Sequence, residues 1–269
     1  MTGKQSDGPF VGYGTDGVRA TLTLDSPHNR NAISPRLIAD FTAGLARAQE
    51  DPQVRAIVLT HSGGTFCAGA DLSAAAGGDT GGGDTGSGEG AAPSPTAAMA
   101  GLLRSILECP KPVIGLIDGH VRAGGMGLVG ACDIVVAGPR CTFALTEARL
   151  GLAASIVSLT VLPRMSSRAA GRYFLTGETF DRERAEAMGL VTVAADDAAA
   201  ATDRLVAELR KASPQGLAES KALLTRGLLA GFDSDAARLC ERSARLFGTP
   251  EAIEGMTAFL QKRAPSWAE

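Results

Sequence analysis

Two apolar runs, each followed by a glycine-bearing turn, constrain the fold of this 269-residue chain more than any other feature. Residues 56–60 lead toward the turn at 66–71, and residues 112–117 lead toward Gly124 and Gly125. Short apolar runs bounded by turn signals are typical of buried strands. Backbone N–H groups in a turn after a strand can point away from the sheet, and two that converge suit an enolate oxygen. The sequence therefore predicts a buried sheet with an oxyanion-binding edge.

The order of strand-like and helix-like segments predicts an α/β fold. An alternating strand at 19–24 precedes a helix that Ser34 caps and that ends before Asp51, and the run at 57–60 follows it. A second helix at 99–107 leads in the same way into the second apolar run. Such alternation indicates a sheet that is covered by helices.

A C-terminal helical region at 196–269 is expected behind a core domain at 1–195. Ser213 and Thr249, each followed by proline, are expected to precede helices, and residues 233–234 are expected to cap another helix between them. No strand-like segment remains for these helices to cover. Their apolar faces must therefore pack on the core or on another subunit, so we expect oligomerisation.

A glycine-rich insertion at about 74–98 interrupts the core domain. Eight glycines lie between Gly77 and Gly90, and no apolar side chain larger than alanine occurs from Gly77 to Ala98. Such a segment cannot build a core. We interpret it as a solvated insertion; the alternative is a mobile lid over the site that Ala70 borders.

Composition excludes several classes of partner. The 26 lysines and arginines are interspersed among 29 acidic residues, with no basic run and few aromatic residues for base stacking, which argues against nucleic acid. No apolar stretch approaches the roughly 18 residues that a membrane span requires, and the N-terminus lacks an apolar leader. We therefore expect a soluble, cytoplasmic protein that does not bind a membrane.

The cysteines and histidines do not form a recognisable metal or disulfide pattern. The five cysteines are an odd number at irregular spacings without a C-x-x-C pair, so we predict buried free thiols. The three histidines are isolated in the sequence, with no repeated ligand spacing. We assign no metal.

A series of short motifs spans nearly the whole chain outside the insertion. They are NRNA at 29–32, FCAGADL at 66–72, KPVI at 111–114, DGH at 118–120, GG at 124–125, CDI at 132–134, FALTE at 143–147 and EGMTAFL at 254–260. In this order they resemble the crotonase family, also called the enoyl-CoA hydratase/isomerase family.

The resemblance implies a crotonase-like spiral of ββα units with a C-terminal helical trimerisation region, and hence a homotrimer or a dimer of trimers. It also implies acyl-CoA thioester substrates, with coenzyme A as part of the substrate and no separate cofactor. By the family's pattern, the N–H groups of Ala70 and Gly124 would hold the thioester oxygen of the enolate. The residues expected to line the CoA arm are Arg30, Ala32, Ala68, Asp71, Leu72 and Gly125.

Hydratases that this chain resembles use two glutamates, and the sequence matches only one of them. Glu147 stands at the position of the second glutamate, whereas Gly127 stands at the position of the first. Glu147 would then perform both proton steps or be helped by a hydroxyl or an ordered water. The hydroxyl residues nearby in sequence are Thr146, Ser155 and Ser158. Alternatively, Glu147 could pair with Arg149 or Arg164, as most surface glutamates do.

The segment at 143–154, with glycine at 127, looks most like the bacterial 3-methylglutaconyl-CoA hydratase-like branch. Residues 155–160 replace several glycines of many hydratases, so we expect a more apolar wall of the acyl pocket. The first hypothesis is a lyase that adds water to a 2-enoyl-CoA, with a branched or glutaconyl-type acyl chain as a candidate. The alternatives are an enoyl-CoA isomerase, for which one carboxylate suffices, and a non-catalytic acyl-CoA-binding protein.

Overall fold

The computed structural model describes residues 8–70 and 93–268, and the strands within these ranges form two sheets. The larger sheet has the order β1 (Val11–Asp16), β2 (Arg19–Leu24), β3 (Ala56–His61), β5 (Val113–Ile117), β7 (Ile134–Ala137) and β10 (Val193–Ala194). The smaller sheet has the order β4 (Thr65–Cys67), β6 (His120–Arg122), β8 (Thr142–Ala144) and β9 (Phe180–Asp181). Only the β1–β2 and β8–β9 pairs among these strands are antiparallel.

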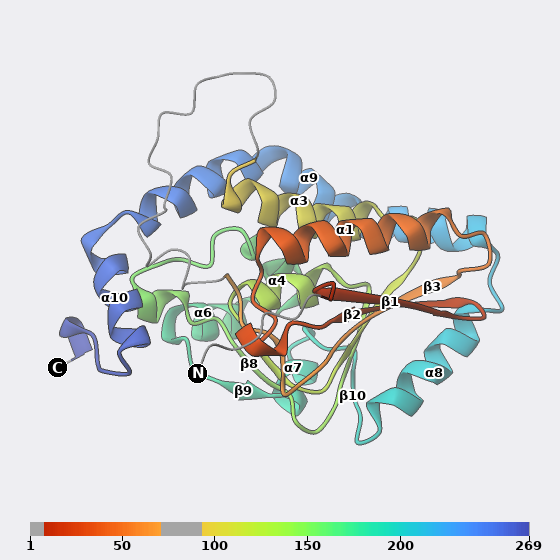
Figure 1. The fold of residues 1–269 in the computed structure, drawn as a ribbon, viewed down its shortest axis with the longest axis horizontal. Coiled ribbons are helices and arrows are strands. Elements are labelled where there is room, and N and C mark those ends of the chain that lie inside the picture. The colour runs from red at the N-terminus through yellow and green to blue at the C-terminus, as the bar shows by residue number, and fades with distance from the viewer. Residues whose placement is uncertain (1–7, 71–92, 269) are drawn as a thin grey trace.

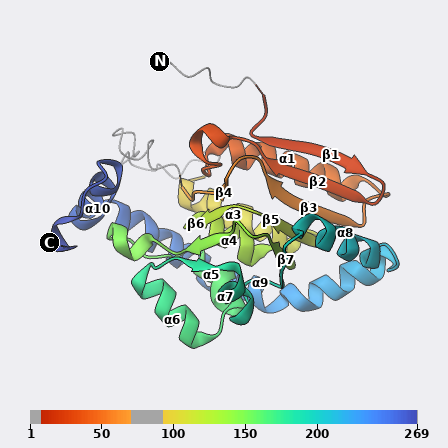
Figure 2. The same cartoon turned by 90° about the horizontal axis from the view of Figure 1, so that it is seen from below.

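Helices lie on both faces of the larger sheet, and Figure 1 shows α1 and α3 above strands β1–β3 and α8 below them. The α-helices are α1 (Pro35–Glu50), α3 (Pro95–Glu108), α4 (Gly124–Ala131), α5 (Ser158–Val161), α6 (Ser167–Thr176), α7 (Arg182–Ala187), α8 (Ala198–Leu209), α9 (Pro214–Phe247) and α10 (Pro250–Leu260). Short 3-10 helices occur as η1 (Pro27–Asn29), η2 (Glu147–Leu150), η3 (Leu162–Arg164) and η4 (Ser266–Ala268). In Figure 2, α10 and the C-terminus lie at one end of the molecule and α8 at the other.

The chain repeats a strand–strand–helix unit, which confirms the predicted α/β spiral. In the units β3-β4-α3 and β5-β6-α4, the first strand pairs in the larger sheet and the second strand pairs in the smaller sheet. Val58 of β3 lies opposite Ile114 of β5, and Cys67 of β4 lies opposite Val121 of β6. Successive units therefore add parallel strands to both sheets, and the turns after β4, β6 and β8 leave the same edge of the smaller sheet.

Apolar side chains fill both faces of the larger sheet. One face packs with α1, α3 and α4 around fully buried residues such as Phe41 and Ile57. On the other face, Val58 and Ile114 pack against Ala201 of α8. Burial of each such aliphatic or aromatic side chain stabilises the folded state by roughly 1.5–3 kcal/mol. These two layers therefore hold the strand ends in fixed positions.

Several predicted helix ends are confirmed, and the start of α3 is corrected. Ser34 accepts a hydrogen bond from the N–H of Leu37 and caps α1, and Thr249 caps α10. Helix α3 begins at Pro95, so residues 95–98 do not belong to the glycine-rich insertion. Ser94 caps α3 and a proline at the first position fixes φ, which explains the earlier start. The rest of the insertion at 71–92 lies outside the described residues.

The predicted helix start at 233–234 is wrong, because α9 runs through these residues without a break. Asp233 accepts a hydrogen bond from the Arg104 side chain of α3 at 2.6 Å, and Ser234 Oγ donates to the carbonyl of Gly231 within the helix. Both side chains thus have partners other than the N–H groups that a cap would serve. Helix α9 packs along α3, and this contact supports its length.

A buried ion pair ties α9 to the sheet. Lys221 Nζ lies 2.7 Å from Asp133 Oδ2 and also donates to the carbonyls of Ile106 and Lys111 at 2.8 and 3.0 Å. The same Asp133 oxygen accepts the N–H of Val113 at 2.7 Å. The ammonium therefore has three acceptors, which offset much of the cost of burying it.

All five cysteines are free; Cys240 is half-buried and the other four are buried, which matches the predicted buried thiols for those four. Burial raises the pKa of Cys67 and of Cys132 to about 12, so both thiols stay protonated at neutral pH. Among the described residues, no helix is long and apolar enough to cross a membrane. The same residues contain no group of three or more His, Cys, Asp or Glu side chains that could hold a metal ion.

Candidate active site

The two glycine-bearing turns lie side by side at the edge of the smaller sheet. Strands β4 and β6 pair in parallel, and the turns follow directly after them. Gly69 has φ of 91°, and a Cβ on it would lie 2.8 Å from the Cβ of Ala123 and 3.1 Å from the backbone nitrogen of Gly124. Glycine is therefore required here by both the left-handed backbone and the close approach of the second turn.

The backbone N–H groups of Ala70 and Gly124 at this junction have no acceptor within the described parts of the chain. Ala70 is held in a bridge with Ile33, and Gly124 is the first residue of α4, where the helix presents its positive end. Ala123 precedes α4 with φ of 46° and ψ of −116°, and its N–H donates to the carbonyl of Ala144 at 3.1 Å. The strained backbone of Ala123 sets the direction in which α4 begins. Free donors of this kind can hold an oxyanion.

Glu147 follows β8, the strand that pairs with β6, and begins η2. The residue as a whole is half-buried, but its Oε2 atom is buried and has no hydrogen-bond partner in the described ranges of the chain. Burial raises the pKa of this carboxyl to about 7, and a hydrogen bond from its own backbone N–H offsets part of the rise. A carboxyl with a pKa near neutrality can both accept and return a proton, as a general acid/base must.

The alternative in which Glu147 forms a surface ion pair is wrong. Arg149 Nε donates to the carbonyl of Thr176 at 2.7 Å, and Arg164 Nε donates to the carbonyl of Gly130 at 3.2 Å. Glu147 has no ion pair among the described residues. Its carboxylate is thus free to face a bound molecule.

The space beside Gly127 is filled by hydrocarbon. A Cβ on Gly127 would lie 2.9 Å from Cγ1 of Val157 and 3.0 Å from Cδ1 of Leu103. The space where a side chain of residue 127 would lie is therefore occupied by these apolar groups and does not hold water. The sequence predicted a more apolar wall from residues 155–160, which include Val157. It did not identify Leu103, because that residue comes from a helix that is distant in sequence.

Comparison with known families identifies the class of protein to which the two glycine-bearing turns and Glu147 belong. The model of the enoyl-CoA hydratase/isomerase family matches residues 15–269. The chain belongs to the enoyl-CoA hydratase/isomerase family. It is an enoyl-CoA hydratase-like enzyme, and the substrates of its family are acyl-CoA thioesters.

Relatives of known structure or activity cover almost the full length of this hydratase. A protein of known crystal structure from Mycobacterium avium paratuberculosis K-10 shares 56% sequence identity with this chain. The match covers 96% of this chain and 99% of that chain, and the TM-score is 0.87. An enoyl-CoA hydratase from Mycobacterium avium is 55% identical over 96% of this chain and 98% of its own, with a TM-score of 0.86. The mevalonyl-coenzyme A hydratase of Aspergillus fumigatus is 32% identical over 91% of this chain and 90% of its own.

Part of the predicted CoA-binding set lies together beside the first turn of the hydratase. Arg30 is exposed with φ of 59°, and its carbonyl accepts the N–H of Ala68 at 3.1 Å, while Ala32 is buried close by in sequence. Gly125 is buried, and a Cβ on it would lie 2.7 Å from the carbonyl oxygen of Cys67. Packing thus explains why this residue is glycine, and its contact with CoA stays a prediction. The predicted residues Asp71 and Leu72 lie outside the described residues.

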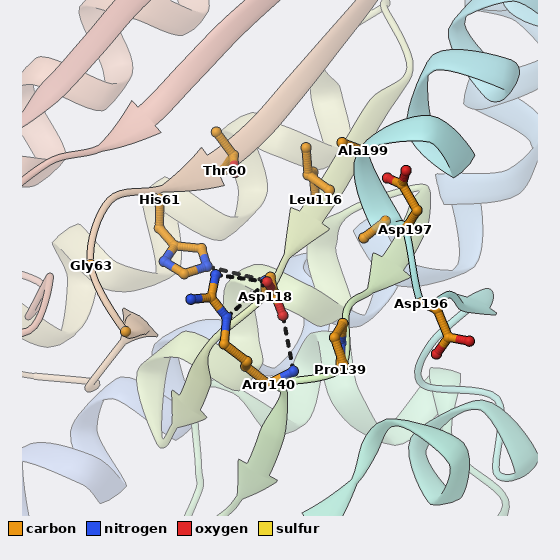
Figure 3. A pocket seen from close by; sticks show the side chains of 12 residues that line it. Thr60, His61, Gly63, Leu116, Asp118, Pro139, Arg140, Asp196, Asp197 and Ala199 are labelled. Carbon is orange, nitrogen blue, oxygen red and sulfur yellow. Dashed lines mark hydrogen bonds and ion pairs between the residues drawn. The ribbon is translucent and has the colours of Figure 1, made fainter.

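A separate cavity of about 860 Å³ opens where β3, β5 and β7 end and α8 begins (Figure 3). On its wall, Asp118 Oδ2 lies 2.7 Å from Nη2 of Arg140, and the Asp118 N–H donates to His61 Nε2 at 3.1 Å. Burial lowers the pKa of His61, so its ring is neutral at pH 7. Because Asp118 is paired and Glu147 is not, hydratase chemistry is better supported at the Glu147 site.

Proposed function

We propose that Glu147, together with the N–H groups of Ala70 and Gly124, adds water across the double bond of a 2-enoyl-CoA. The observation that carries this proposal is the buried Oε2 of Glu147, which has no partner and belongs to a carboxyl with a pKa of about 7. Glu147 follows β8, which pairs with β6, and β6 leads into Gly124. The N–H of Ala123 donates a hydrogen bond to the carbonyl of Ala144 at the end of β8. The carboxylate and the two donors therefore belong to one edge of the smaller sheet.

One carboxylate performs both proton steps in this reaction. Ionised Glu147 accepts a proton from water while the water oxygen bonds to the β carbon of the ester. The electron pair of the double bond moves toward the thioester oxygen, which the N–H groups of Ala70 and Gly124 stabilise as an enolate. Protonated Glu147 then returns a proton to the α carbon. Losing one such donor typically costs about 3 kcal/mol of barrier.

The acyl chain is proposed to be branched or of the glutaconyl type. Support comes from the sequence resemblance and from the apolar wall that Val157 and Leu103 form at Gly127. A relative with 32% identity is named as a mevalonyl-coenzyme A hydratase. Coenzyme A enters as part of the substrate, and we propose that the chain needs no separate cofactor, so dialysis against a chelator should leave the rate unchanged.

An isomerase is the second candidate, and the filled space at Gly127 favours it. Moving a double bond requires one base to take a proton from one carbon and return it to another, with no water in the site. Glu147 suffices for that reaction. The hydrocarbon of Val157 and Leu103 would exclude water from one side of the acyl chain.

We also propose that the chain assembles as a homotrimer or a dimer of trimers. Large apolar side chains are exposed toward the C-terminus, with Ile253 55%, Phe259 56% and Trp267 46% exposed. Leu223 and Leu224 of α9 are 76% and 69% exposed. Another subunit that covers these residues would remove this apolar surface from water. Sedimentation equilibrium at micromolar concentration tests the assembly, and a monomer throughout would contradict it.

The reaction is tested by offering crotonyl-CoA, 3-methylglutaconyl-CoA and a 3-enoyl-CoA in deuterated water to the wild type and to Glu147→Gln. Product masses distinguish hydration from isomerisation. Glu147→Gln should retain CoA-ester binding and lose at least roughly a hundredfold in rate, the scale of a general acid/base contribution. Undiminished turnover by this variant would refute the role of Glu147, and tight binding of every ester without turnover by the wild type would identify a binding protein.

A further inference from the structure

Ser155 carries a buried hydroxyl that has no partner among the residues that the structure describes. The residue is 6% exposed, and its Oγ atom makes no hydrogen bond to any part of residues 8–70 and 93–268. Buried side-chain oxygens are nearly always hydrogen-bonded to protein or to an ordered water. An unpaired one therefore marks a place where a water or a ligand group binds.

The other hydroxyls of the same segment are engaged or lie nearer the surface. Ser158 Oγ donates to the carbonyl of Ser155, and Thr160 Oγ1 donates to the carbonyl of Gly127 at 3.0 Å. Thr146 is half-buried, and its Oγ1 is not among the buried unpaired atoms. Of the hydroxyl residues at 146–160, Ser155 is thus the one whose buried oxygen is left for a bound molecule.

The segment that carries Ser155 connects the catalytic carboxyl with the apolar wall. At its start, the carbonyl of Glu147 accepts the N–H of Leu152 at 2.9 Å. At its end, Val157 lies against the position of Gly127 on α4. Ser155 lies between these points, and both buried unpaired oxygens of the segment, Oε2 of Glu147 and Oγ of Ser155, belong to this one stretch.

We propose that the Ser155 hydroxyl positions the water that Glu147 activates, in place of the carboxylate that is absent at Gly127. This inference rests on the proposed hydratase function. Val157 and Leu103 offer only methyl groups at the side of Gly127, so they cannot orient a water molecule. A serine hydroxyl can either donate a hydrogen bond to water or accept one from it, without a charge of its own.

Ser155 is a positioning residue and gains or loses no proton overall. Glu147 takes one proton from the water, the water oxygen bonds to the β carbon, and the α carbon receives a proton from Glu147. The sum is addition of one water to the ester. Exchange of an α proton of a saturated ester uses the same Glu147 and the same enolate, but it needs no attacking water.

The ratio of the hydration rate to the α-proton exchange rate therefore tests the role of Ser155, because a purely structural role would leave this ratio unchanged. We compare Ser155→Ala with the wild type for hydration of the best ester found above and for α-proton exchange of butyryl-CoA in deuterated water. Hydration should fall roughly tenfold, the effect of losing one hydrogen bond on a barrier, whereas exchange should stay within about twofold. Thr160→Val is the matched control, because it removes a buried hydroxyl of the same segment that has protein partners. Its ratio of hydration to exchange should equal that of the wild type.

The outcomes separate the role of Ser155 from the proposed function. Equal falls of hydration and exchange in Ser155→Ala, or no change in hydration, would refute the role of Ser155 and leave Glu147 in place. If α-proton exchange is lost in Glu147→Gln but not in Ser155→Ala, the result supports the Glu147 carboxyl as the base of both reactions. A wild type that exchanges α protons but hydrates none of the esters would refute both proposals.

Discussion

Two buried carboxyl groups, those of Asp133 and Glu147, have opposite surroundings. Asp133 Oδ2 contacts the ammonium of Lys221 at 2.7 Å and the N–H of Val113 at 2.7 Å, which leaves only its Oδ1 unpaired. Glu147 forms no ion pair with a described residue, and burial raises its pKa to about 7. Asp133 joins α9 to the sheet, whereas Glu147 lies at the edge where the two glycine turns meet.

The difference shows how one fold uses charge in two ways. A buried charge with a partner of opposite sign and several hydrogen bonds is costly to disrupt, so it fixes the position of an element. A buried carboxyl without a partner is costly to ionise, and that cost gives it a useful pKa for proton transfer. The predictions below test this distinction between a structural and a chemical carboxyl.

The largest expected effect is on stability, from Lys221→Met. This change leaves the Asp133 charge buried without its cation, so the free energy of unfolding should fall by about 3–5 kcal/mol in urea titrations. Lys211→Met is the control, because Lys211 and its partner Glu208 are both 70% exposed. That pair should contribute no more than about 1 kcal/mol. Equal small losses in both variants would contradict a structural role for the buried pair.

The next effect is on catalysis, from Gly69→Ala. The added methyl would clash with Ala123 and approach the nitrogen of Gly124, so the two proposed donors would move apart. We expect kcat/KM to fall about a hundredfold, which corresponds to about 3 kcal/mol for one lost oxyanion contact. Gly17→Ala is the control, because Gly17 also has a positive φ but has nothing within 4 Å of its Cβ position. It should lose stability by about 1 kcal/mol and keep its activity.

A third prediction concerns the pH dependence of stability and activity. Glu147 has a folded pKa of about 7, above its ordinary value of 4.5, so the folded state retains a proton that the unfolded state has lost between these pH values. The free energy of unfolding should therefore fall as pH rises from 4.5 to 7 and level off above 7, by about 2 kcal/mol for this partly exposed residue. The kcat/KM should rise over the same range as Glu147 ionises.

Glu147→Gln isolates this contribution, because the shift at His61 is common to both proteins. Urea unfolding at pH 5, 6, 7 and 8 should show the wild type losing stability relative to the variant as pH rises. Parallel curves for the two proteins would mean that the carboxyl of Glu147 is not held in its protonated form by burial.

The sequence predicted the features that depend on local pattern. The caps Ser34 and Thr249 and the two glycine turns follow from neighbouring residues, and the position of Glu147 follows from the family resemblance. The continuity of α9 through Asp233 was not predictable, because its side chain pairs with Arg104 on another helix. Tertiary contacts of this kind override local propensity.

The sequence predicted the residues of the candidate site but not the side chains that pack around them. The sequence showed that residue 127 lacks a side chain, yet it could not show which side chains fill that space. Val157 and Leu103 reach it from separate segments, and only the fold brings them to α4. The φ of 46° at Ala123 likewise had no sequence signal, since alanine rarely adopts this backbone conformation.

The smallest expected effect, from Gly127→Ala, tests the apolar wall that Val157 and Leu103 form beside Gly127. Alanine favours a helix over glycine, but its Cβ would lie 2.9 Å from Val157, so we expect a net loss of about 1 kcal/mol in the free energy of unfolding. In a Val157→Ala background the contact with Val157 is relieved while that with Leu103 at 3.0 Å stays, and the two changes should couple by about 1 kcal/mol in a double-mutant cycle. Gly101→Ala is the control, since this glycine of α3 has nothing within 4 Å and should gain about 0.5–1 kcal/mol.

The coupling bears directly on the missing carboxylate. If residues 127 and 157 compete for one volume, Gly127→Glu alone should not raise hydration of crotonyl-CoA, whereas Gly127→Glu with Val157→Gly should restore room for a second carboxylate and its water. Additive effects of Gly127→Ala and Val157→Ala would contradict this competition. In that case the side chains beside Gly127 would make room for an added side chain at no cost in stability, and the absence of a glutamate there would be independent of Val157.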